Sequence, residues 1–230
     1  MRLDKLLADM QAGTRSEVKQ YIRQGKVTVD GSRVSPKQQV DPGTQTICFF
    51  GKEIHYQKYV YYMLYKPQNC VTARQDAGHK TVMDYIVDKR KDLSPVGRLD
   101  LDTEGLLLIT NDGMLSHNLL SPTKHVEKVY EAKIDGWVTK ADIKAFRQGL
   151  DIGDKTLTKP AELTVLTEGD ISRVRVVITE GRYHQIKRMF AAVGKQVIYL
   201  KRTAMGSLKL DETLLPGEYR ELTKEERNLL

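Results

Sequence analysis

The chain has 230 residues, of which 40% are hydrophobic, so it can build one medium-sized globular domain and one small one. Its formal net charge of +7 suits a polyanionic partner such as a nucleic acid. No apolar run reaches the ~20 residues of a membrane span, and no secretory signal stands at the start, so we expect a cytoplasmic protein without membrane contact. Cys48 and Cys70 lie far apart and form no CxxC pair, which argues against a disulfide framework and against a metal site.

The first 45 residues are predicted to form two short helices followed by a hairpin. Residues 3–10 carry leucines and a methionine at the i, i+3, i+4, i+7 spacing of an amphipathic helix. Thr14 and Glu17 have the spacing of a capping box at the start of a second helix, which Gly25 ends. The stretch 26–31 then alternates and ends in Asp-Gly, which is typical of a hairpin turn.

The solvent sides of these N-terminal elements carry basic residues. They are Arg2, Lys5, Arg15, Lys19, Arg23 and Lys26. Such a pattern is also typical of a solvated helix face. However, the order helix, helix, Arg-Gln-Gly-Lys-Val-Thr-Val-Asp-Gly over residues 23–31 resembles the S4-like RNA-binding domain, over about residues 1–45. The resemblance implies that the second helix and the hairpin rest on RNA backbone and position the protein without specifying a base.

A linker and a larger domain are expected to follow. Gly43, Gly51 and the polar stretch 52–58 mark a plausible linker over residues 46–59. Residues 60–230 then form the second domain. Apolar runs predict its strands at 60–65, 106–110, 130–134, 163–166, 174–178 and 197–200, and apolar stripes predict its helices at 142–150 and 185–193. Because strands and helices do not alternate regularly, we expect an α+β fold with a mixed, largely antiparallel sheet flanked by helices.

The most informative motif is the run from Val96 to Gly113, which begins Val-Gly-Arg-Leu-Asp-Leu-Asp. Alternation along a strand would place Asp100 and Asp102 on one face, at the margin of an apolar strand. A carboxylate displayed in this way can act as a nucleophile. Taken alone, Arg-Leu-Asp is also typical of a junction between a strand and a turn, in which the aspartate caps the turn.

Together with Gly181-Arg-Tyr-His-Gln-Ile-Lys-Arg-Met189, this run resembles the signature of the RNA pseudouridine synthases. The resemblance is to the branch that modifies ribosomal RNA through the aspartate of Gly-Arg-Leu-Asp, the RsuA family, and it extends from Arg2 to about Thr223. Tyr183-His184 favours the small-subunit (16S rRNA) type, since large-subunit relatives often have Gly-Arg-Asn there. Asn69 stands where relatives usually have glycine, but asparagine tolerates left-handed backbone.

The resemblance implies an isomerase of the pseudouridine synthase fold that needs no cofactor. It would convert a specific uridine of 16S rRNA to pseudouridine, acting as a monomer on the rRNA or on a small-subunit assembly intermediate. The reaction breaks the bond from the ribose to the base, rotates the base and rejoins it through carbon 5, which requires one well-placed carboxylate. Asp100 matches that position, as nucleophile or base. Asp102 is assigned a turn or a hydrogen bond to the Thr103 hydroxyl.

Other residues match family positions around the base. Lys187 matches the cation that keeps a buried carboxylate ionised, with Arg188 as a competitor, although a lysine there is also typical of a helix surface. Tyr130 matches the tyrosine that lies against the base, and Leu200 the apolar residue under it. By themselves, both are typical of core packing.

Three polar residues are expected at the rim of the site. Arg98 either enters the base stack vacated by the flipped uridine or holds a phosphate, or else it pairs with Asp100 or Asp102. Arg182 and His184 either contact RNA phosphate or hold the loop, and a histidine alone is also typical of a satisfied core position.

Three alternative functions remain at this stage. The first is a large-subunit rRNA pseudouridine synthase of the same family. The second is a non-catalytic RNA-binding or ribosome-assembly factor, which would need neither Asp100 nor Lys187. The third is a glycosylase that flips and excises uracil, leaving an abasic ribose and lowering the RNA mass.

Overall fold

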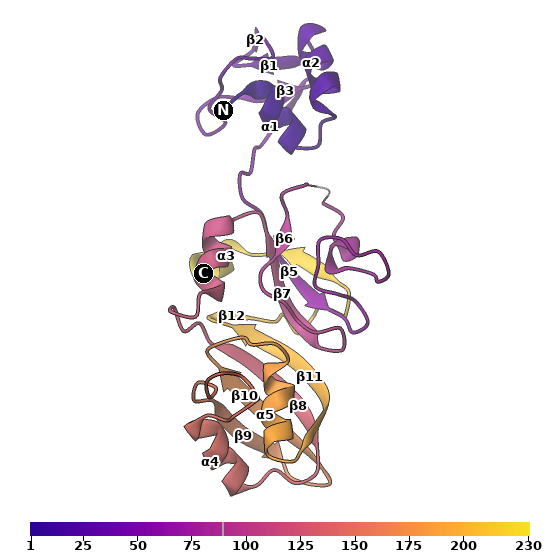
Figure 1. The fold of residues 1–230 in the computed structure, drawn as a ribbon. Coiled ribbons are helices and arrows are strands. Elements are labelled where there is room, and N and C mark those ends of the chain that lie inside the picture. Colours follow the sequence, from indigo (N-terminus) through magenta and orange to yellow (C-terminus); the bar gives the residue numbers. More distant parts are fainter. Residues whose placement is uncertain (89) are drawn as a thin grey trace. The chain divides into compact units, whose positions relative to one another are not determined.

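The fold was analysed in a computed structural model, which describes residues 1–88 and 90–230. The chain divides into two compact units (Figure 1). The N-terminal unit comprises Met1–Tyr59 together with Asp88–Asp92, and the C-terminal unit comprises Val60–Val87 and Leu93–Leu230. No helix in the described part of the chain has the length and apolarity that a bilayer crossing requires.

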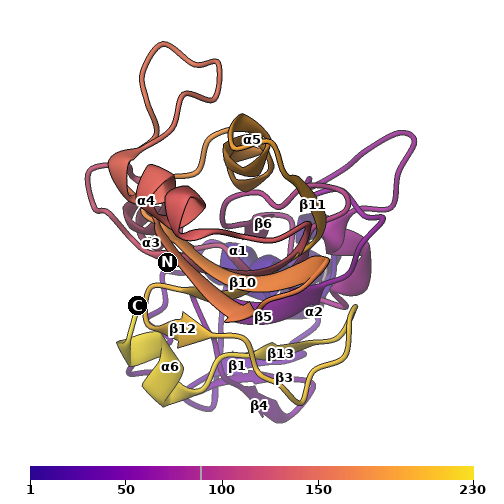
Figure 2. The same cartoon turned by 90° about the horizontal axis from the view of Figure 1, so that it is seen from below.

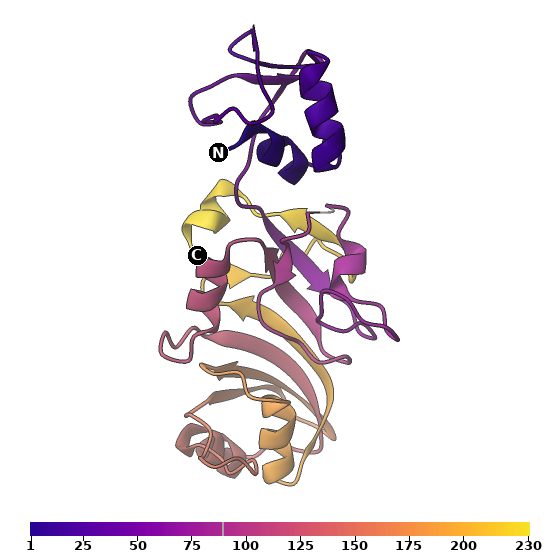
Figure 3. The ribbon, with the colours of Figure 1, turned by 45° about the horizontal axis from the view of Figure 1, so that its top comes forward.

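The N-terminal unit contains two helices and a four-stranded antiparallel sheet (Figure 3). In chain order its elements are α1 (Leu3–Asp9), α2 (Arg15–Arg23), β1 (Val27–Val29), β2 (Ser32–Arg33), β3 (Ile47–Phe49) and β4 (Lys52–Ile54). The predicted capping box at the start of α2 is present: the Thr14 hydroxyl accepts from the Glu17 N–H, and the Glu17 carboxylate accepts from the Thr14 N–H. The two helices and the hairpin are therefore where the sequence predicts them.

The stretch 46–59 differs from the expected linker because part of it belongs to this sheet. All three residues of β3 pair with β1 on one side and with β4 on the other. Ile47 is buried among the leucines of α1 and the valines of β1, which explains why the segment folds back. β4 is an edge strand on which Lys52 and Glu53 are exposed, while Ile54 packs against the core.

The C-terminal unit is built on a nine-stranded mixed sheet. Its main path runs β13-β5-β7-β11-β8-β10-β9, with β6 paired to β7 and β12 paired to β11. The strands are β5 (Tyr61–Lys66), β6 (Ser94–Pro95), β7 (Glu104–Thr110), β8 (Lys128–Asp135), β9 (Glu162–Thr167), β10 (Ile171–Ile178), β11 (Gln196–Met205), β12 (Leu208–Lys209) and β13 (Tyr219–Glu221). The helices are η1 (Val82–Tyr85, a 3₁₀ turn), α3 (Gly113–Leu120), α4 (Lys140–Gln148), α5 (Gln185–Ala192) and α6 (Lys224–Asn228). The α+β class and the largely antiparallel sheet are confirmed, since β7 and β11 are the one parallel pair between named strands in the described residues.

Helices α4 and α5 cover one face of the half of the sheet formed by β8, β10 and β9 (Figure 2). Alternation along β8 points Tyr130, Ala132 and Ile134 into the core beneath these helices. Phe146 of α4 and Phe190 of α5 meet there with ring centroids 4.8 Å apart. The same core face carries the pocket described below.

Gly105 permits the close approach of β7 and β11, on which the site depends. Its φ is +107°, and a Cβ at this position would lie 2.2 Å from the Arg202 carbonyl oxygen of the neighbouring strand. We expect Gly105→Ala to lower the free energy of unfolding by about 2–5 kcal/mol, because backbone strain and overpacking add. Gly113→Ala is the control, since a Cβ there meets nothing within 4 Å. Urea unfolding of both variants would measure the difference, and equal stabilities would contradict this account.

Candidate active site

Asp100 lies in a turn between two strands and not on a strand as predicted. β6 ends at Pro95 and β7 begins at Glu104. The Thr103 N–H donates to the Asp100 carbonyl oxygen at 3.1 Å, which closes the turn. The alternation argument for Asp100 and Asp102 therefore does not apply, because the backbone bends before the apolar strand starts. The turn nevertheless brings both carboxylates to one place.

The segment from Lys66 to Thr72 holds this turn by its backbone. The fully buried Lys66 ammonium donates to the carbonyl oxygens of Asp100 at 3.0 Å, Thr103 at 2.8 Å and Pro67 at 3.0 Å. Asn69 adopts the left-handed backbone expected of it, with φ 61°, and its N–H donates to the Leu101 carbonyl oxygen at 2.8 Å. Burial lowers the pKa of Lys66, and nearby acidic groups oppose this shift only in part. The three carbonyl oxygens accept hydrogen bonds from the ammonium.

Thr72 adds a reciprocal contact to Leu99. Its hydroxyl donates to the Leu99 carbonyl oxygen at 2.8 Å and accepts from the Leu99 N–H at 3.1 Å. Sequence reasoning missed both Lys66 and Thr72. A lysine at the end of an apolar strand was the one signal that could have drawn attention to this segment.

We expect Thr72→Val to loosen the turn. The change removes the hydroxyl at nearly constant volume and leaves two buried backbone groups of Leu99 without a partner, which costs about 1–3 kcal/mol of stability. Misplacement of the turn should lower activity between about tenfold and a hundredfold. Thr72→Ser keeps the hydroxyl and should restore most of both. Thermal unfolding and turnover of the two variants test this, and equal behaviour of Val and Ser would contradict it.

Lys187 bridges the two carboxylates of the turn. Its ammonium lies 3.2 Å from Asp100 Oδ2 and 2.5 Å from Asp102 Oδ1. Burial raises the pKa of Asp102, but the hydrogen bond and charge of Lys187 outweigh it, and the net pKa lies below the ordinary value. Burial lowers the pKa of Lys187, and the two aspartates outweigh that effect and raise it. Lys187 therefore stays charged.

Of the two roles predicted for Asp102, the place in a turn is confirmed and the hydrogen bond to the Thr103 hydroxyl is wrong. Its carboxylate accepts from Lys187 and is not bonded to the Thr103 hydroxyl, which is buried without a hydrogen-bond partner. The i, i+2 spacing around the turn brings Asp102 to the same cation as Asp100.

His184 also reaches Asp100. It stands at the N-terminus of α5 with φ 47° and ψ 35°, a strained conformation for a residue with a side chain. Its Nε2 lies 3.6 Å from Asp100 Oδ1, and its ring stacks on Tyr183 at 3.8 Å. It is not the core histidine that composition alone would favour, since its side chain is 37% exposed.

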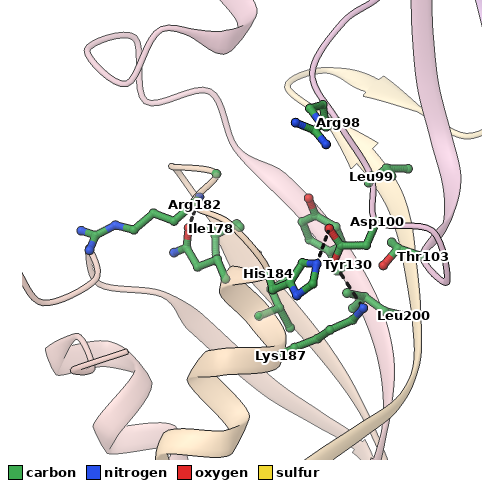
Figure 4. Close-up of a pocket in the computed structure, with 13 residues that line it drawn as sticks. Arg98, Leu99, Asp100, Thr103, Tyr130, Ile178, Arg182, His184, Lys187 and Leu200 are labelled. Carbon is green, nitrogen blue, oxygen red and sulfur yellow. Dashed lines mark hydrogen bonds and ion pairs between the residues drawn. The ribbon is translucent and has the colours of Figure 1, made fainter. Parts of the chain in front are cut away.

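A pocket opens between the turn and the sheet (Figure 4). Tyr130 of β8 and Leu200 of β11 line it from the sheet, and both also pack in the core beneath α5. Asp100 projects into it between Tyr130 and Lys187. Tyr130, Leu200 and Lys187, which the sequence predicts around a base, therefore line one pocket with the Asp100 carboxylate.

Arg182 and Arg188 point away from Asp100. Arg182 extends to the loop 154–157, where it donates to the carbonyl oxygens of Thr156 and Leu157 at 2.7 Å and pairs with Asp154 (Figure 4). Arg188 pairs with Asp154 at 2.6 Å and also donates to the Ile152 carbonyl oxygen. Of the two roles expected for Arg182, the structure favours holding a loop over binding phosphate. Arg188 is not placed to compete with Lys187.

Arg98 lies at the mouth of the pocket and is exposed. Within residues 1–88 and 90–230 it forms no ion pair with Asp100 or Asp102, which was one of its predicted roles. Its guanidinium is thus available at the opening.

Comparison with known proteins decides the family. The family described as RNA pseudouridylate synthase matches residues 60–192, and the S4 domain matches residues 1–45. The chain belongs to the RNA pseudouridylate synthase family. It is therefore an RNA-modifying isomerase with an N-terminal S4 domain, and membership in this family sets aside the non-catalytic and base-excising alternatives.

Individual members of the pseudouridylate synthase family are similar over the whole chain. An uncharacterized RNA pseudouridine synthase, YtzG, of Bacillus subtilis is 46% identical and covers 100% of this chain and 98% of its own. Ribosomal small subunit pseudouridine synthase A of Escherichia coli is 42% identical, over 98% of each chain. A crystal structure of a pseudouridylate synthase superposes with a TM-score of 0.71 at 39% identity, covering 100% and 99% of the two chains.

Proposed function

We propose that this enzyme isomerises one specific uridine of small-subunit ribosomal RNA, acting as a monomer on the rRNA or on an assembly intermediate. The relatives named small subunit pseudouridine synthase A support the substrate, because they match this chain from end to end. Tyr183-His184, directly before α5, supports the same small-subunit branch of the family. A large-subunit target remains the alternative within the family.

The observation that carries the proposed mechanism is the ion-pair cluster of Asp100, Asp102 and Lys187 beside Tyr130. In our proposal, Asp100 attacks the sugar or removes a proton while the bond between the anomeric carbon and N1 breaks. Lys187, 3.2 Å from Asp100 Oδ2, supplies the counter-charge to this carboxylate in the half-buried pocket. The detached base turns, and carbon 5 bonds to the anomeric carbon as the Asp100 ester breaks or, on the other route, as the sugar regains its proton. Carbon 5 then loses its proton to solvent and N1 gains one, so that no atoms are gained or lost.

The pocket walls would hold the base during this rotation. Tyr130 stacks on one side, which is worth roughly 1–3 kcal/mol per base, and Leu200 supports the uracil from the sheet. Arg98 at the mouth fills the stack that the flipped uridine leaves or holds a neighbouring phosphate. His184 positions Asp100 from the side opposite the turn.

We propose that residues 1–45 contact the RNA backbone and that the catalytic domain begins at residue 60. Lys5, Arg15, Arg23 and Lys26 are exposed, and Lys19 is partly exposed. Arg2 is the exception, because its guanidinium pairs with the buried Asp4 at 2.6 Å and so stabilises the start of α1.

Replacing Arg15, Lys19 and Arg23 of α2 by glutamine should weaken RNA binding and leave the rate on saturating RNA unchanged. Each lost phosphate contact should reduce the slope of log affinity against log salt by about 0.7 to 0.9. The charge-preserving exchanges Arg15→Lys, Lys19→Arg and Arg23→Lys are the control. Titrations at several salt concentrations give both slopes, and equal slopes would remove the phosphate role of α2.

The experiment that tests the proposed function is a map of pseudouridine in rRNA from cells with and without the gene. We expect one position of small-subunit rRNA to lose its modification and to regain it on re-expression of the wild-type protein. Loss of a large-subunit position instead would select the alternative.

A further inference from the structure

Two buried cations of the C-terminal unit have no carboxylate partner among the residues that the structure describes. Lys128 is 6% exposed, and its ammonium donates to the Val126 carbonyl oxygen at 2.7 Å. Arg202 is 3% exposed, and its Nε donates to the Leu106 carbonyl oxygen at 2.8 Å. The Nη2 of Arg202 is buried without a hydrogen-bond partner, and among the described residues no carboxylate lies within ion-pair distance of either side chain. Buried cations are normally paired, so these side chains make this place in the fold suited to an anion.

Two further nitrogen bases continue the cluster to the surface. Lys159 is half-buried, and its ammonium donates to the Pro122 carbonyl oxygen at 3.0 Å and lies 3.1 Å from Nδ1 of the exposed His125. Lys159 contacts His125 and Lys128 contacts the next residue, Val126, so both lysines lie against one short segment. Burial, together with the charges of Arg202 and Lys159, lowers the pKa of Lys128. We call Lys128, Arg202, Lys159 and His125 the cationic cluster.

The cationic cluster adjoins the pocket through the sheet. Lys128 stands two residues before Tyr130 on β8 and pairs with Ile178 of β10, while Arg202 of β11 pairs with Tyr130. Tyr130 and Ile178 both line the pocket. Lys128 and Arg202 therefore lie on the pocket side of the sheet, one step along the strands.

The Arg182 contacts fix the outer end of the cluster beside the same pocket. Arg182 donates to the carbonyl oxygens of Thr156 and Leu157, three and two residues before Lys159. The Glu180 carboxylate, which pairs with Arg182, also accepts the Lys159 backbone N–H at 2.9 Å. This carboxylate contacts the main chain of Lys159, whereas the Lys159 ammonium contacts Pro122 and His125.

We propose that the cationic cluster is a phosphate-binding site for RNA, which receives a backbone phosphate next to the nucleotide in the pocket. Lys159 and His125 contact the phosphate at the surface. Lys128 and Arg202 add a positive field from the low-dielectric interior beneath them. That the anion belongs to RNA rests on the proposed function, whereas the preference of the site for an anion rests on the buried charges alone.

Lys128→Met separates an anion site from a structural role, because the two roles predict opposite stability effects. Methionine fills a similar volume and removes a desolvated charge that two neighbouring cations repel. We expect the free protein to melt at the same or a higher temperature, while RNA affinity falls about three- to tenfold. A lower melting temperature with unchanged RNA affinity would overturn the proposal.

Two surface variants test the contact itself. Lys159→Gln removes the outer cation, and His125→Asn removes the imidazole with a residue that tolerates the φ of 50° at this position. We expect Lys159→Gln to reduce the salt slope of RNA binding by about 0.7 to 0.9, and His125→Asn to lower RNA affinity about two- to fivefold. Lys133→Gln is the matched control, since Lys133 is exposed on the same strand with its side chain on the opposite face.

Binding is measured with Asp100→Asn as the common background, so that no turnover enters the titration. One RNA is a small-subunit rRNA transcript, and the other is an unrelated RNA of equal length, because phosphate contacts carry no sequence information. The same slope change on both RNAs supports the site even if the rRNA target is wrong. Unchanged slopes for Lys159→Gln on both RNAs would reject the site, whatever the mapping of pseudouridine shows.

Discussion

Asp100→Asn should reduce isomerisation by more than about a thousandfold, because it deletes the carboxylate that we propose as the reacting group. The change is nearly isosteric, and the turn is held through the backbone carbonyl of Asp100, so folding and RNA binding should persist. Release of tritium from carbon 5 of labelled uridine in rRNA transcripts measures the reaction. Melting temperature and RNA affinity, measured on the same protein, show whether the loss is chemical.

Asp102→Asn is the matched control for Asp100→Asn. It lies in the same turn and on the same cation, but its side chain is 66% exposed and does not line the pocket. We expect a loss of activity no greater than about tenfold, since one of the two anchors of Lys187 is weakened. Substantial tritium release by Asp100→Asn, or a larger loss in Asp102→Asn, would overturn the assignment of the reacting group.

Lys187→Met should lower activity about a hundredfold, because Asp100 would then lie in the half-buried pocket beside the exposed Asp102 without the cation that both carboxylates share. Lys187→Arg should keep a measurable part of the rate, since charge matters first and the geometry of the donor second. Single-turnover rates on saturating RNA separate this effect from a change in affinity.

Arg188→Met supplies the comparison for Lys187→Met. Arg188 is the next residue on α5, but its ion pair is to Asp154 on the loop that Arg182 also holds. Its loss should weaken that loop and leave the rate of bond cleavage within about threefold. If Arg188→Met is the more damaging variant, the pairing of Lys187 with Asp100 is not the one that matters for the reaction.

The elements of this fold are largely encoded in local patterns. The capping box of Thr14 and Glu17, the Asp-Gly turn and the apolar stripe of α5 depend on neighbours within a few residues, and the structure has all three. The strands β3 and β4 were missed, because their short, polar segments become strands only by pairing with β1. Tertiary pairing decided their state, and local propensity did not.

The candidate site was found only in outline. Motif resemblance named Asp100, Lys187, Tyr130 and Leu200, and these four line one pocket. It could not reveal that Lys66 and Thr72 hold the turn, since these contacts join segments more than 25 residues apart. The reach of Arg182 to the loop 154–157 was equally hidden, because a long side chain at a helix start can extend in several directions.

The parallel pairing of β7 with β11 determines when the pocket can form during folding. Glu104 and Gly105 pair with Lys201 and Arg202, so the two segments meet across about a hundred intervening residues. Closing such a long loop is slow relative to local helix and hairpin formation. Until β11 has been synthesised, the turn that carries Asp100 lacks the strand that lines one side of the pocket. The pocket therefore assembles only after β11 has been synthesised, later than the turn that carries Asp100.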